Sequence, residues 1–349
     1  SQDKPVADLR FYQGLGPITI TEIAALSGAA ISDSAIGSMM LSDVAPLEAA
    51  QSGKLSYAES HKALTAHAGG GLGGVFLIVP PDLAGLAGEM GALGLTHPAP
   101  RQAFSRIGSH LFSLREFEGT DRQHPDADCH ETARIAPGAV IAAGASIGEG
   151  VSIGANAAIG PGCRIGRFTS IGANVTISCA DIGEHCNILA GAVIGEAGFG
   201  VAVSGGSVID VPHLGTVRIG DHVTVGANSA IDRGVFGETR IGDGCKIDNL
   251  CHVAHNVSLG EACLMPAFAG VSGSTRIGRG VMFGGRVGVS DHVVIGDGAR
   301  IGANSAVMAD VPAGETYAGA PAQPIRQHMR EIAEIRRMVR ARAKARTGE

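Results

Sequence analysis

The sequence predicts a mainly β protein: a solenoid of short parallel strands, with a small α/β domain before it and a single helix after it. Three observations carry this prediction. An aliphatic residue recurs every six positions from residue 135 onward, the first 125 residues lack this period, and apolar residues after 323 recur at helical spacing. The 349 residues are 45% hydrophobic and 17% charged, a composition that suits a large core and excludes global disorder.

The six-residue period is held over four series, which cover 135–177, 182–194, 219–231 and 241–307. A period of six fits neither an amphipathic helix nor one long strand. It fits a short strand, a corner and another short strand, because Gly and Asn tolerate the backbone of a tight corner. A Gly-rich linker, the alternative that the 53 glycines raise, would not keep an aliphatic residue in phase for twelve successive repeats.

Stacked coils of this kind bury the recurring aliphatic residues, which we call rungs, in a one-dimensional core. Three hexads make one coil of about 18 residues, so the solenoid predicted for 126–322 has roughly nine coils. Each fully buried Ile or Val rung contributes about 1.5–3 kcal/mol. The break at 195–218 is too long for a corner and is expected to leave the coil as an excursion loop.

Two shorter regions flank the solenoid. Residues 1–125 indicate an α/β domain, in which Thr19 and Glu22 form a capping-box pattern before a short helix that Gly28 ends. Residues 323–349 indicate a helix with eight basic and three acidic side chains. Its basic face is either simply solvated or a docking surface for an acidic partner. Its apolar stripe needs the coil, or copies of itself, to pack on.

Charge and composition exclude several classes of protein. The net charge of −6 argues against a general nucleic-acid binder. No stretch reaches the roughly 18 uninterrupted apolar residues of a membrane span, and the first residues lack the order of a signal peptide. The seven cysteines include no CxxC pair, which favours reduced thiols and a cytoplasmic protein.

The strongest departure from a plain scaffold repeat is the segment KIDNLCHVAHNV, which covers 246–257. With its aliphatic rungs facing inward, His255 should point outward and Asp248 should lie on a neighbouring edge of the same coil. A carboxylate near an imidazole suits the imidazole to general-base work near neutral pH. His292 lies two coils and one residue further along, about 10 Å away on the same side of the solenoid. Either histidine alone is also compatible with an ordinary surface position.

Other chemistries fit the sequence less well. His252 and His255 are three apart in a strand-like segment, so their side chains point in opposite directions and we expect no metal site. The cysteines lack an activating partner and are expected to pack in the core. No Walker loop is present, and GEAGFG at 195–200 lacks the strand–turn–helix context of a dinucleotide fingerprint.

Four motifs together resemble one family. IDRG at 231–234, KIDNLCHVAHNV, GEAGFG and SGSTRIG at 272–278, in this spacing, are similar to the UDP-3-O-(3-hydroxyacyl)glucosamine N-acyltransferases of lipid A biosynthesis, which are hexapeptide-repeat acyltransferases. The resemblance covers nearly the whole chain and is strongest over 135–325. It implies a left-handed parallel β-helix, an N-terminal uridine-nucleotide-binding domain, and a homotrimer with active sites between neighbouring helices.

The resemblance also implies the reaction and its residues. A 3-hydroxyacyl chain moves from the phosphopantetheine thioester of acyl carrier protein to the 2-amino group of UDP-3-O-(3-hydroxyacyl)glucosamine. His255 is implied as general base, Asp248 as the residue that orients it, and Asn249 as part of the same site. His292 is expected to contact substrate or stabilise developing charge, and the backbone N–H of Gly273 is a candidate oxyanion donor. No bound metal or redox cofactor is implied, since the phosphopantetheine arrives with the carrier protein.

The nucleotide contacts depart from the family pattern of an aromatic residue, an Asn and a second aromatic residue. In KLSYAESHKAL, Tyr57 keeps the first aromatic residue, Ser60 replaces the Asn and Ala63 replaces the second aromatic residue. Tyr57 and Ser60 are therefore the expected uracil contacts. The acyl chain needs an apolar groove, for which Met265 and Phe268 are candidates.

Three rival functions share parts of this pattern. A related O-acyltransferase, or a transferase that uses a short acyl-CoA on another nucleotide sugar, would share the fold and the base. A metal-dependent or non-catalytic solenoid would share the fold alone. A scaffold that only binds acyl carrier protein would share the basic helix but would not need His255.

Overall fold

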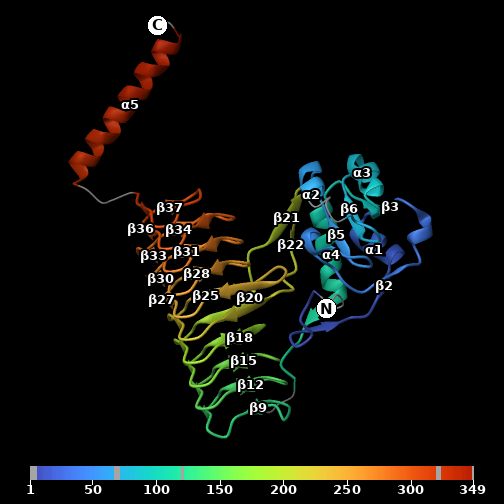
Figure 1. Ribbon diagram of the computed structural model, residues 1–349, viewed down its shortest axis with the longest axis horizontal. Coiled ribbons are helices and arrows are strands. Elements are labelled where there is room, and N and C mark those ends of the chain that lie inside the picture. Colours follow the sequence, from blue (N-terminus) through green and yellow to red (C-terminus); the bar gives the residue numbers. More distant parts are fainter. Residues whose placement is uncertain (1–5, 67–70, 119–121, 320–323, 348–349) are drawn as a thin grey trace.

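The computed structural model describes residues 6–66, 71–118, 122–319 and 324–347. Most of the chain coils into a solenoid whose wall consists of three parallel sheets, with a separate α/β domain beside it and a helix beyond its last coil (Figure 1). Consecutive short strands go to successive sheets, so each sheet takes every third strand through most of the solenoid. The predicted left-handed parallel β-helix with an N-terminal α/β domain and a C-terminal helix is confirmed.

The strands of the three sheets follow in order along the solenoid. The first sheet contains β10 (Arg134–Ile135), β13 (Ser152–Ile153), β16 (Ser170–Ile171), β19 (Asn187–Ile188), β24 (Thr224–Val225), β27 (Lys246–Ile247), β30 (Leu264–Met265), β33 (Met282–Phe283), β36 (Arg300–Ile301) and β38 (Thr316–Tyr317). The second contains β11 (Val140–Ile141), β14 (Ala158–Ile159), β17 (Thr176–Ile177), β20 (Val193–Ala197), β25 (Ala230–Arg233), β28 (His252–Val253), β31 (Gly270–Val271), β34 (Gly288–Val289) and β37 (Ala306–Val307). The third contains β9 (Asp128–Cys129), β12 (Ser146–Ile147), β15 (Arg164–Ile165), β18 (Ala180–Ile182), β23 (Thr216–Ile219), β26 (Glu238–Ile241), β29 (Ser258–Leu259), β32 (Arg276–Ile277) and β35 (Val294–Ile295).

The rungs stack directly on one another and fill the interior. In the second sheet, for example, Ile141 pairs with Ile159, and Ile159 pairs with Ile177. The exposed fraction of these three side chains is 1%, 0% and 0%. Because a strand alternates its side chains between faces, the preceding residue of each pair points outward. The outer surface of the solenoid is therefore free to vary.

Corners of successive coils approach each other closely. A Cβ on Gly154 would lie 2.5 Å from the backbone nitrogen of Ala173 in the next coil, so no larger residue fits there without a shift. Asn156, at the same corner, has a φ of 58°, a left-handed conformation that Asn adopts more readily than most residues. The IGAN-type sequences of the repeat therefore match a physical requirement of the corner.

The N-terminal domain is built on a four-stranded sheet of β3 (Ala30–Ile31), β7 (Leu93–Thr96), β6 (Phe76–Val79) and β5 (Leu55–Tyr57). Two further pairs are β1 (Tyr12–Gly14) with β8 (Phe112–Leu114), and β2 (Ile18–Thr19) with β4 (Met40–Leu41). Its helices are α1 (Ile20–Ser27), α2 (His61–Ala66), α3 (Ala84–Glu89) and α4 (Pro100–Leu111), with short 3-10 turns at Ser34–Ile36, Leu47–Ala49 and Pro81–Leu83. The predicted capping box of Thr19 and Glu22 and the left-handed Gly28 at the end of α1 are both confirmed.

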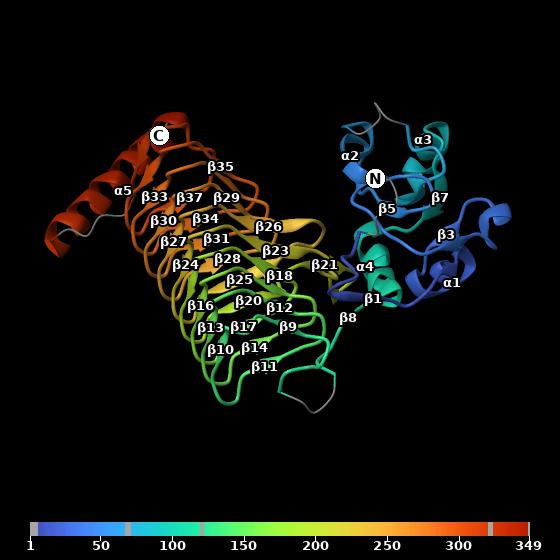
Figure 2. The same cartoon turned by 60° about the horizontal axis from the view of Figure 1, so that its bottom comes forward.

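The excursion forms an antiparallel hairpin of β21 (Val201–Ser204) and β22 (Ser207–Asp210). This hairpin contacts α4 of the N-terminal domain, and both views place β21 beside α4 (Figures 1 and 2). The excursion therefore bridges the solenoid and the N-terminal domain.

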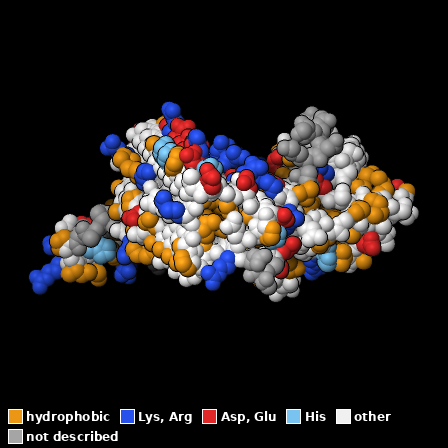
Figure 3. Space-filling view, turned by 90° about the horizontal axis from the view of Figure 1, so that it is seen from below, with side chains coloured by type: hydrophobic (Ala, Val, Ile, Leu, Met, Phe, Trp, Pro, Cys, Tyr) orange, Lys and Arg blue, Asp and Glu red, His pale blue; other side chains and the backbone are white. Residues whose placement is uncertain are grey.

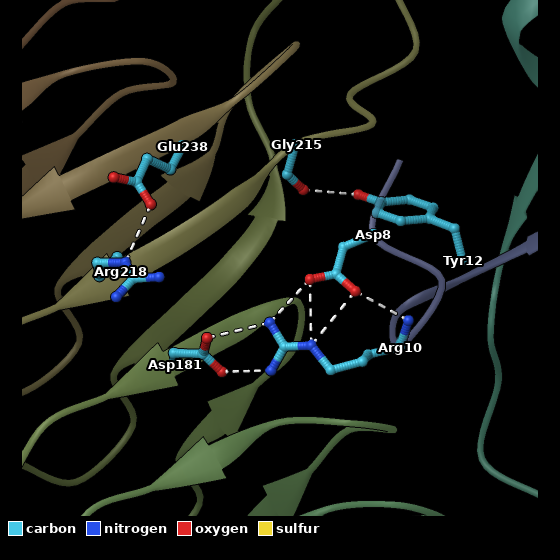
Figure 4. Close-up of polar contacts among 7 residues, drawn as sticks. All are labelled: Asp8, Arg10, Tyr12, Asp181, Gly215, Arg218 and Glu238. Carbon is cyan, nitrogen blue, oxygen red and sulfur yellow. Dashed lines mark hydrogen bonds and ion pairs between the residues drawn. The ribbon is translucent and has the colours of Figure 1, made fainter. Parts of the chain in front are cut away.

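The segment before β1 fastens the same domain to the third sheet (Figure 4). The Arg10 guanidinium donates to both carboxylate oxygens of Asp181, at 2.8 and 3.0 Å, and also binds Asp8. The Asp181 hydrogen bond, opposed by burial, raises the pKa of Arg10. The Tyr12 hydroxyl lies 2.8 Å from the Gly215 carbonyl and 3.0 Å from the His213 carbonyl. The side of the solenoid that faces the domain is therefore held in place by buried polar contacts.

Beyond the last coil, α5 (Ile325–Thr347) extends away from the solenoid (Figure 1). Its side chains between 325 and 342 are exposed, apart from the intermediate Ile332. Within the described residues, no helix combines the length and apolar character needed to cross a membrane.

We expect Val225→Ala to destabilise the solenoid by about 1.5–3 kcal/mol, because Val225 is a fully buried rung. The matched control is Val294→Ala, since the Val294 side chain is 44% exposed on the outer face of β35. That substitution should change the free energy of unfolding by less than about 0.5 kcal/mol. Urea unfolding followed by circular dichroism measures both, and equal losses would contradict this account of the core.

Candidate active site

His255 lies at the corner between β28 and β29, which we call the His255 corner (254–257). β28 pairs in register with β25 below it and with β31 above it. This register makes Val253 an inward rung and places His255 two residues later, where the chain turns outward. The outward position predicted for His255 agrees with this placement.

Asn256 fixes the orientation and the tautomer of the His255 ring. Its amide Oδ1 accepts the Val235 backbone N–H at 2.9 Å, and its Nδ2 donates to the Phe236 carbonyl at 2.5 Å. With the amide held in this sense, His255 Nδ1, 3.2 Å from Asn256 Oδ1, must carry the hydrogen and donate it. The lone pair of the neutral ring is therefore on Nε2, the nitrogen that a general base needs.

Gly273, in the next coil, lies directly against this nitrogen. A Cβ on Gly273 would be 2.7 Å from both Nε2 and Cε1 of His255, so only glycine leaves space there. At some comparable corners the backbone N–H is capped by a carboxylate, as Asp248 caps Ala267 and Asp297 caps Arg279. Within the described part of the chain, the Gly273 N–H has no such acceptor. The candidate base and a backbone N–H without an acceptor in the described chain thus lie next to each other.

His292 belongs to the same column of corners. The His255 carbonyl accepts the Ser274 N–H at 3.0 Å, and the Gly273 carbonyl accepts the His292 N–H at 3.1 Å. His292 is exposed and has a left-handed φ of 58°. The structure therefore brings His255, Gly273 and His292 onto one edge of the solenoid, and the spacing in the sequence predicts this for the two histidines.

Asp248 and Asn249 lie elsewhere, at the corner between β27 and β28, which we call the Asp248 corner (248–251). The two Asp248 carboxylate oxygens accept the N–H groups of Asn249 and Ala267 at 2.8 and 3.2 Å. Asn249 Oδ1 accepts the N–H of Ala227 at 2.6 Å. The expectation that Asp248 orients His255 is wrong within one chain, because a whole side of the coil separates the two corners. Asn256 orients the ring instead.

The carboxylate beside His255 is Asp232, in the IDRG motif at the end of β25. Its Oδ2 lies 3.5 Å from His252 Nε2, and its side chain is only 11% exposed. A Cβ on Gly198 would be 2.9 Å from Asp232 Oδ2 and 3.2 Å from His255 Cδ2, so the GEAGFG loop covers both groups. The motif signalled this residue, but its place beside His255 could not be read from the repeat alone.

Two further residues hold the excursion over the His255 corner. Buried Arg233 donates to the Gly195 carbonyl at 2.8 Å and to the His213 carbonyl at 3.1 Å, which ties both ends of the excursion together. The His213 ring packs edge-on against the His255 ring, with 5.2 Å between centroids. Burial, and next the neighbouring His255, lower the pKa of His213 to about 4, so this ring is neutral at physiological pH.

A cavity of about 460 Å³ lies next to the His255 corner. The N-terminal domain and the solenoid both contribute to its wall: Pro46, Glu48, Val235, Phe236, Gly237, Asn256, Ser274 and Arg276. Arg276 is exposed and, among the described residues, makes no ion pair with a carboxylate. The cavity thus offers a cation within one coil of the candidate base.

The two expected uracil contacts differ in their surroundings. Tyr57 packs on Phe104 with 4.9 Å between ring centroids, and Phe104 in turn contacts Phe236 of the cavity wall at 6.0 Å. Burial raises the pKa of Tyr57, so its hydroxyl stays protonated. Ser60 Oγ accepts the Ala63 N–H at 3.2 Å near the start of α2. Tyr57 is therefore linked to the cavity through aromatic packing, whereas Ser60 is engaged in its own helix.

The two candidates for an acyl groove are also separated. The Met265 side chain is a rung with 1% exposure, so it cannot line an outer groove, while Phe268 is 53% exposed.

In the described ranges, no group of three or more His, Cys, Asp or Glu side chains is arranged to hold a metal ion.

Comparison with known proteins agrees with the repeat and with the motifs. The bacterial transferase hexapeptide model matches 144–179 and 274–308, and the model for the hexapeptide repeat of succinyl-transferase matches 216–249. UDP-3-O-acylglucosamine N-acyltransferase of Maricaulis maris (strain MCS10) is 57% identical over 97% of this chain and 98% of its own. The enzyme of the same name from Caulobacter sp. (strain K31) is 47% identical over 95% of this chain and 96% of its own. The chain belongs to the UDP-3-O-acylglucosamine N-acyltransferase family.

As a member of this family, the chain is an acyltransferase of lipid A biosynthesis. Among solved structures, the UDP-N-acetylglucosamine O-acyltransferase from Moraxella catarrhalis RH4 is 29% identical, covers 58% of this chain and 73% of its own, and has a TM-score of 0.44. The family membership rests on the full-length sequence relatives.

We expect Asn256→Ala to release the tautomer of His255, because the acceptor that holds Nδ1–H is removed. Nitrogen-15 NMR of the imidazole should then show more of the Nε2–H form than in the wild type. Asn304→Ala is the matched control, since Asn304 has nearly the same left-handed φ, 58° against 59°, at another corner. An unchanged tautomer in Asn256→Ala would contradict the assigned role.

Proposed function

We propose that the protein transfers a 3-hydroxyacyl chain from the thioester of acyl carrier protein to the 2-amino group of UDP-3-O-acylglucosamine. One observation carries this proposal. His255 is held with its Nε2 lone pair against Gly273, whose N–H lacks an acceptor in the described chain. A thioester is already activated, so a positioned base and an oxyanion donor suffice for acyl transfer.

The proposed steps use these groups alone. The sugar amine attacks the thioester carbonyl while His255 Nε2 takes a proton from the nitrogen. The Gly273 N–H donates to the oxyanion of the tetrahedral intermediate. Collapse of the intermediate forms the amide and expels the phosphopantetheine thiolate, which takes the proton from the His255 imidazolium. The base is regenerated, and the only cofactor group is the one attached to the carrier protein.

The cavity beside the His255 corner suits a nucleotide sugar. Arg276 offers a guanidinium to the diphosphate, since arginine binds phosphate oxygens with two parallel N–H groups. From there the sugar would reach His255 and the nucleoside would reach the N-terminal domain near Tyr57 and Ser60. His292 would stand above the sugar and contact the substrate or the charge that develops during the reaction.

We also propose a cytoplasmic homotrimer, as the family resemblance implies. Two large side chains support an interface along the edge of the solenoid that includes the Asp248 corner. Leu250 in that corner is 48% exposed, and Phe268 in the corner one coil further along is 53% exposed. Both are in the left-handed conformation, with φ of 57° and 63°, which is uncommon for bulky residues. A neighbouring copy that brings this edge toward His255 would place Asn249 and Phe268 near the site and give the acyl chain an apolar wall.

We expect His255→Ala to lower N-acylation by at least about 10²-fold, the scale of a lost general base. Mass spectrometry of product formation, with 3-hydroxyacyl carrier protein and UDP-3-O-acylglucosamine as substrates, measures the loss. His222→Ala is the control, because His222 is an exposed histidine at another corner of the solenoid. Circular dichroism checks that both variants are folded.

Other outcomes of this assay redirect the proposal. Full activity in folded His255→Ala would show that His255 is not the base, and His292 would be the next candidate. Acylation of a sugar hydroxyl, or use of a short acyl-CoA in place of the carrier protein, would favour the rival transferases. Absence of any product with wild-type protein would overturn the proposed reaction.

The basic helix α5 is proposed as the docking surface for acyl carrier protein, a strongly acidic partner. Figure 3 shows basic and apolar side chains together on this helix, at the left edge of the view. Arg336 and Arg340 are exposed one turn apart, and apolar Met329, Ile335 and Val339 are 55–61% exposed on the same helix. Charge complementarity of this kind increases the association rate and depends on salt.

We expect the double substitution Arg336→Glu and Arg340→Glu to raise KM for the acyl carrier protein by about tenfold, while KM for the nucleotide sugar stays the same. The effect should shrink at high salt. Arg300→Glu, on the outer face of β36, is the control for a change of net charge. Equal KM values in steady-state kinetics for the wild type and the double variant would contradict docking on α5.

A further inference from the structure

We propose that Asp232 is a positioning residue for His255: its buried carboxylate supplies the negative charge that stabilises the protonated imidazole during transfer. This inference rests on the proposed function, in which His255 becomes positively charged. It gives the carboxylate of the IDRG motif a role that is separate from the orientation of the ring, which Asn256 performs.

The register of the second sheet brings Asp232 to this place. Ala230 pairs with His252, and Ile231 pairs with Val253, so Asp232 lies on the outer face directly below Ala254. From there its carboxylate is 3.5 Å from His252 Nε2 on one side. On the other side, a single methyl group placed on Gly198 would touch both Asp232 Oδ2 and His255 Cδ2. Asp232 and His255 are therefore neighbours beneath one short loop.

Burial leaves this carboxylate few ways to be stabilised. Within the described chain, its one ion-pair contact is with His252, which is 51% exposed. Burial raises the pKa of Asp232, whereas the charges of His252, His255 and Arg233 oppose that rise. The ionised carboxylate is stabilised most when the adjacent imidazoles are protonated. It stabilises their protonated form by the same free energy of interaction.

Gly198 packs closely against both Asp232 and His255. Its backbone needs no special conformation, but a Cβ would come within 2.9 Å of Asp232 Oδ2. Charged or titratable groups of the neighbouring elements act on Asp232 or on His213, the two residues that flank the His255 ring: Arg233 from β25, His252 from β28, and Glu196 and Asp210 from the excursion. His292 lies in the same column of corners as His255. Of the three carboxylates, Asp232 is buried, whereas Glu196 and Asp210 are exposed.

Asn256 and Asp232 lie on different sides of the His255 ring, and this gives them different roles. Asn256 binds Nδ1 and sets the tautomer of the neutral base. Asp232 lies toward Cδ2 and acts on the charged form. Asn256 is a neutral partner, so it cannot by itself balance the imidazolium that forms when the amine loses its proton. The carboxylate performs that task without touching the substrate.

The test combines two substitutions with opposite expected signs. Asp232→Asn removes a negative charge, so the midpoint of the His255 titration, followed by carbon-13 NMR without substrate, should fall by about half a pH unit or more. His252→Gln removes a group that can carry positive charge, so the same midpoint should rise. For Asp232→Asn, kcat/KM should decrease by about 10- to 100-fold, and its acid limb should move to lower pH.

Matched controls separate this role from simple loss of structure. Asp297→Asn changes an exposed carboxylate that caps the Arg279 N–H, and should move neither the titration nor the rate. Gly198→Ala should lower kcat by wedging a methyl group between the carboxylate and the ring, whereas Gly288→Ala, which meets open space, should not. An unchanged His255 midpoint in folded Asp232→Asn would overturn the proposal. The NMR titration needs no substrate, so it tests the role of Asp232 independently of the proposed reaction. Failure of the proposed reaction would be revealed separately, if the wild-type protein formed no product.

Discussion

Coil-on-coil stacking in strict register is the constraint on which this molecule depends. Each rung lies over the rung of the coil below, as Ile159 lies over Ile141, and apolar side chains, most of them aliphatic, fill the interior. Corners must then approach within contact distance, which leaves no space for a Cβ at positions such as Gly154. Because the interior is so restricted, chemistry can be placed only on the outer face and at the corners.

The two breaks in the repeat meet at the candidate site. The excursion leaves the coil after β20, and the RGVFG insertion separates β25 from β26. Arg233, from the second break, binds the carbonyls at both ends of the first. The Asn256 side chain is hydrogen-bonded to the backbone of Val235 and Phe236, which belong to the second break. Both breaks therefore cover one corner, and a regular coil would have left His255 on an open surface.

Much of the fold could be predicted because hexad periodicity is a local signal. The rungs, the excursion, the capping box of Thr19 and Glu22, and the position of His255 and His292 on one side all follow from local sequence patterns. Contacts that cross a break could not be predicted in this way. Asp232 meets the His255 corner only because four residues loop out between β25 and β26, which changes the spacing of paired rungs from 18 residues to 22. Within one chain Asp248 does not reach His255 for a related reason: seven residues along the chain amount to about one side of a coil.

The His255 ring is enclosed on three sides, and this decides how a substrate can approach. Nδ1 is bound to Asn256, Cδ2 lies under Gly198, and the His213 ring packs edge-on with 5.2 Å between the ring centroids. Nε2 and Cε1 face the space that a side chain on Gly273 would have filled. In the proposed reaction, the amine would approach Nε2 from the side of the ring that borders the Gly273 backbone. On that approach the carbonyl under attack would come close to the Gly273 N–H, which is the oxyanion donor in the proposed mechanism.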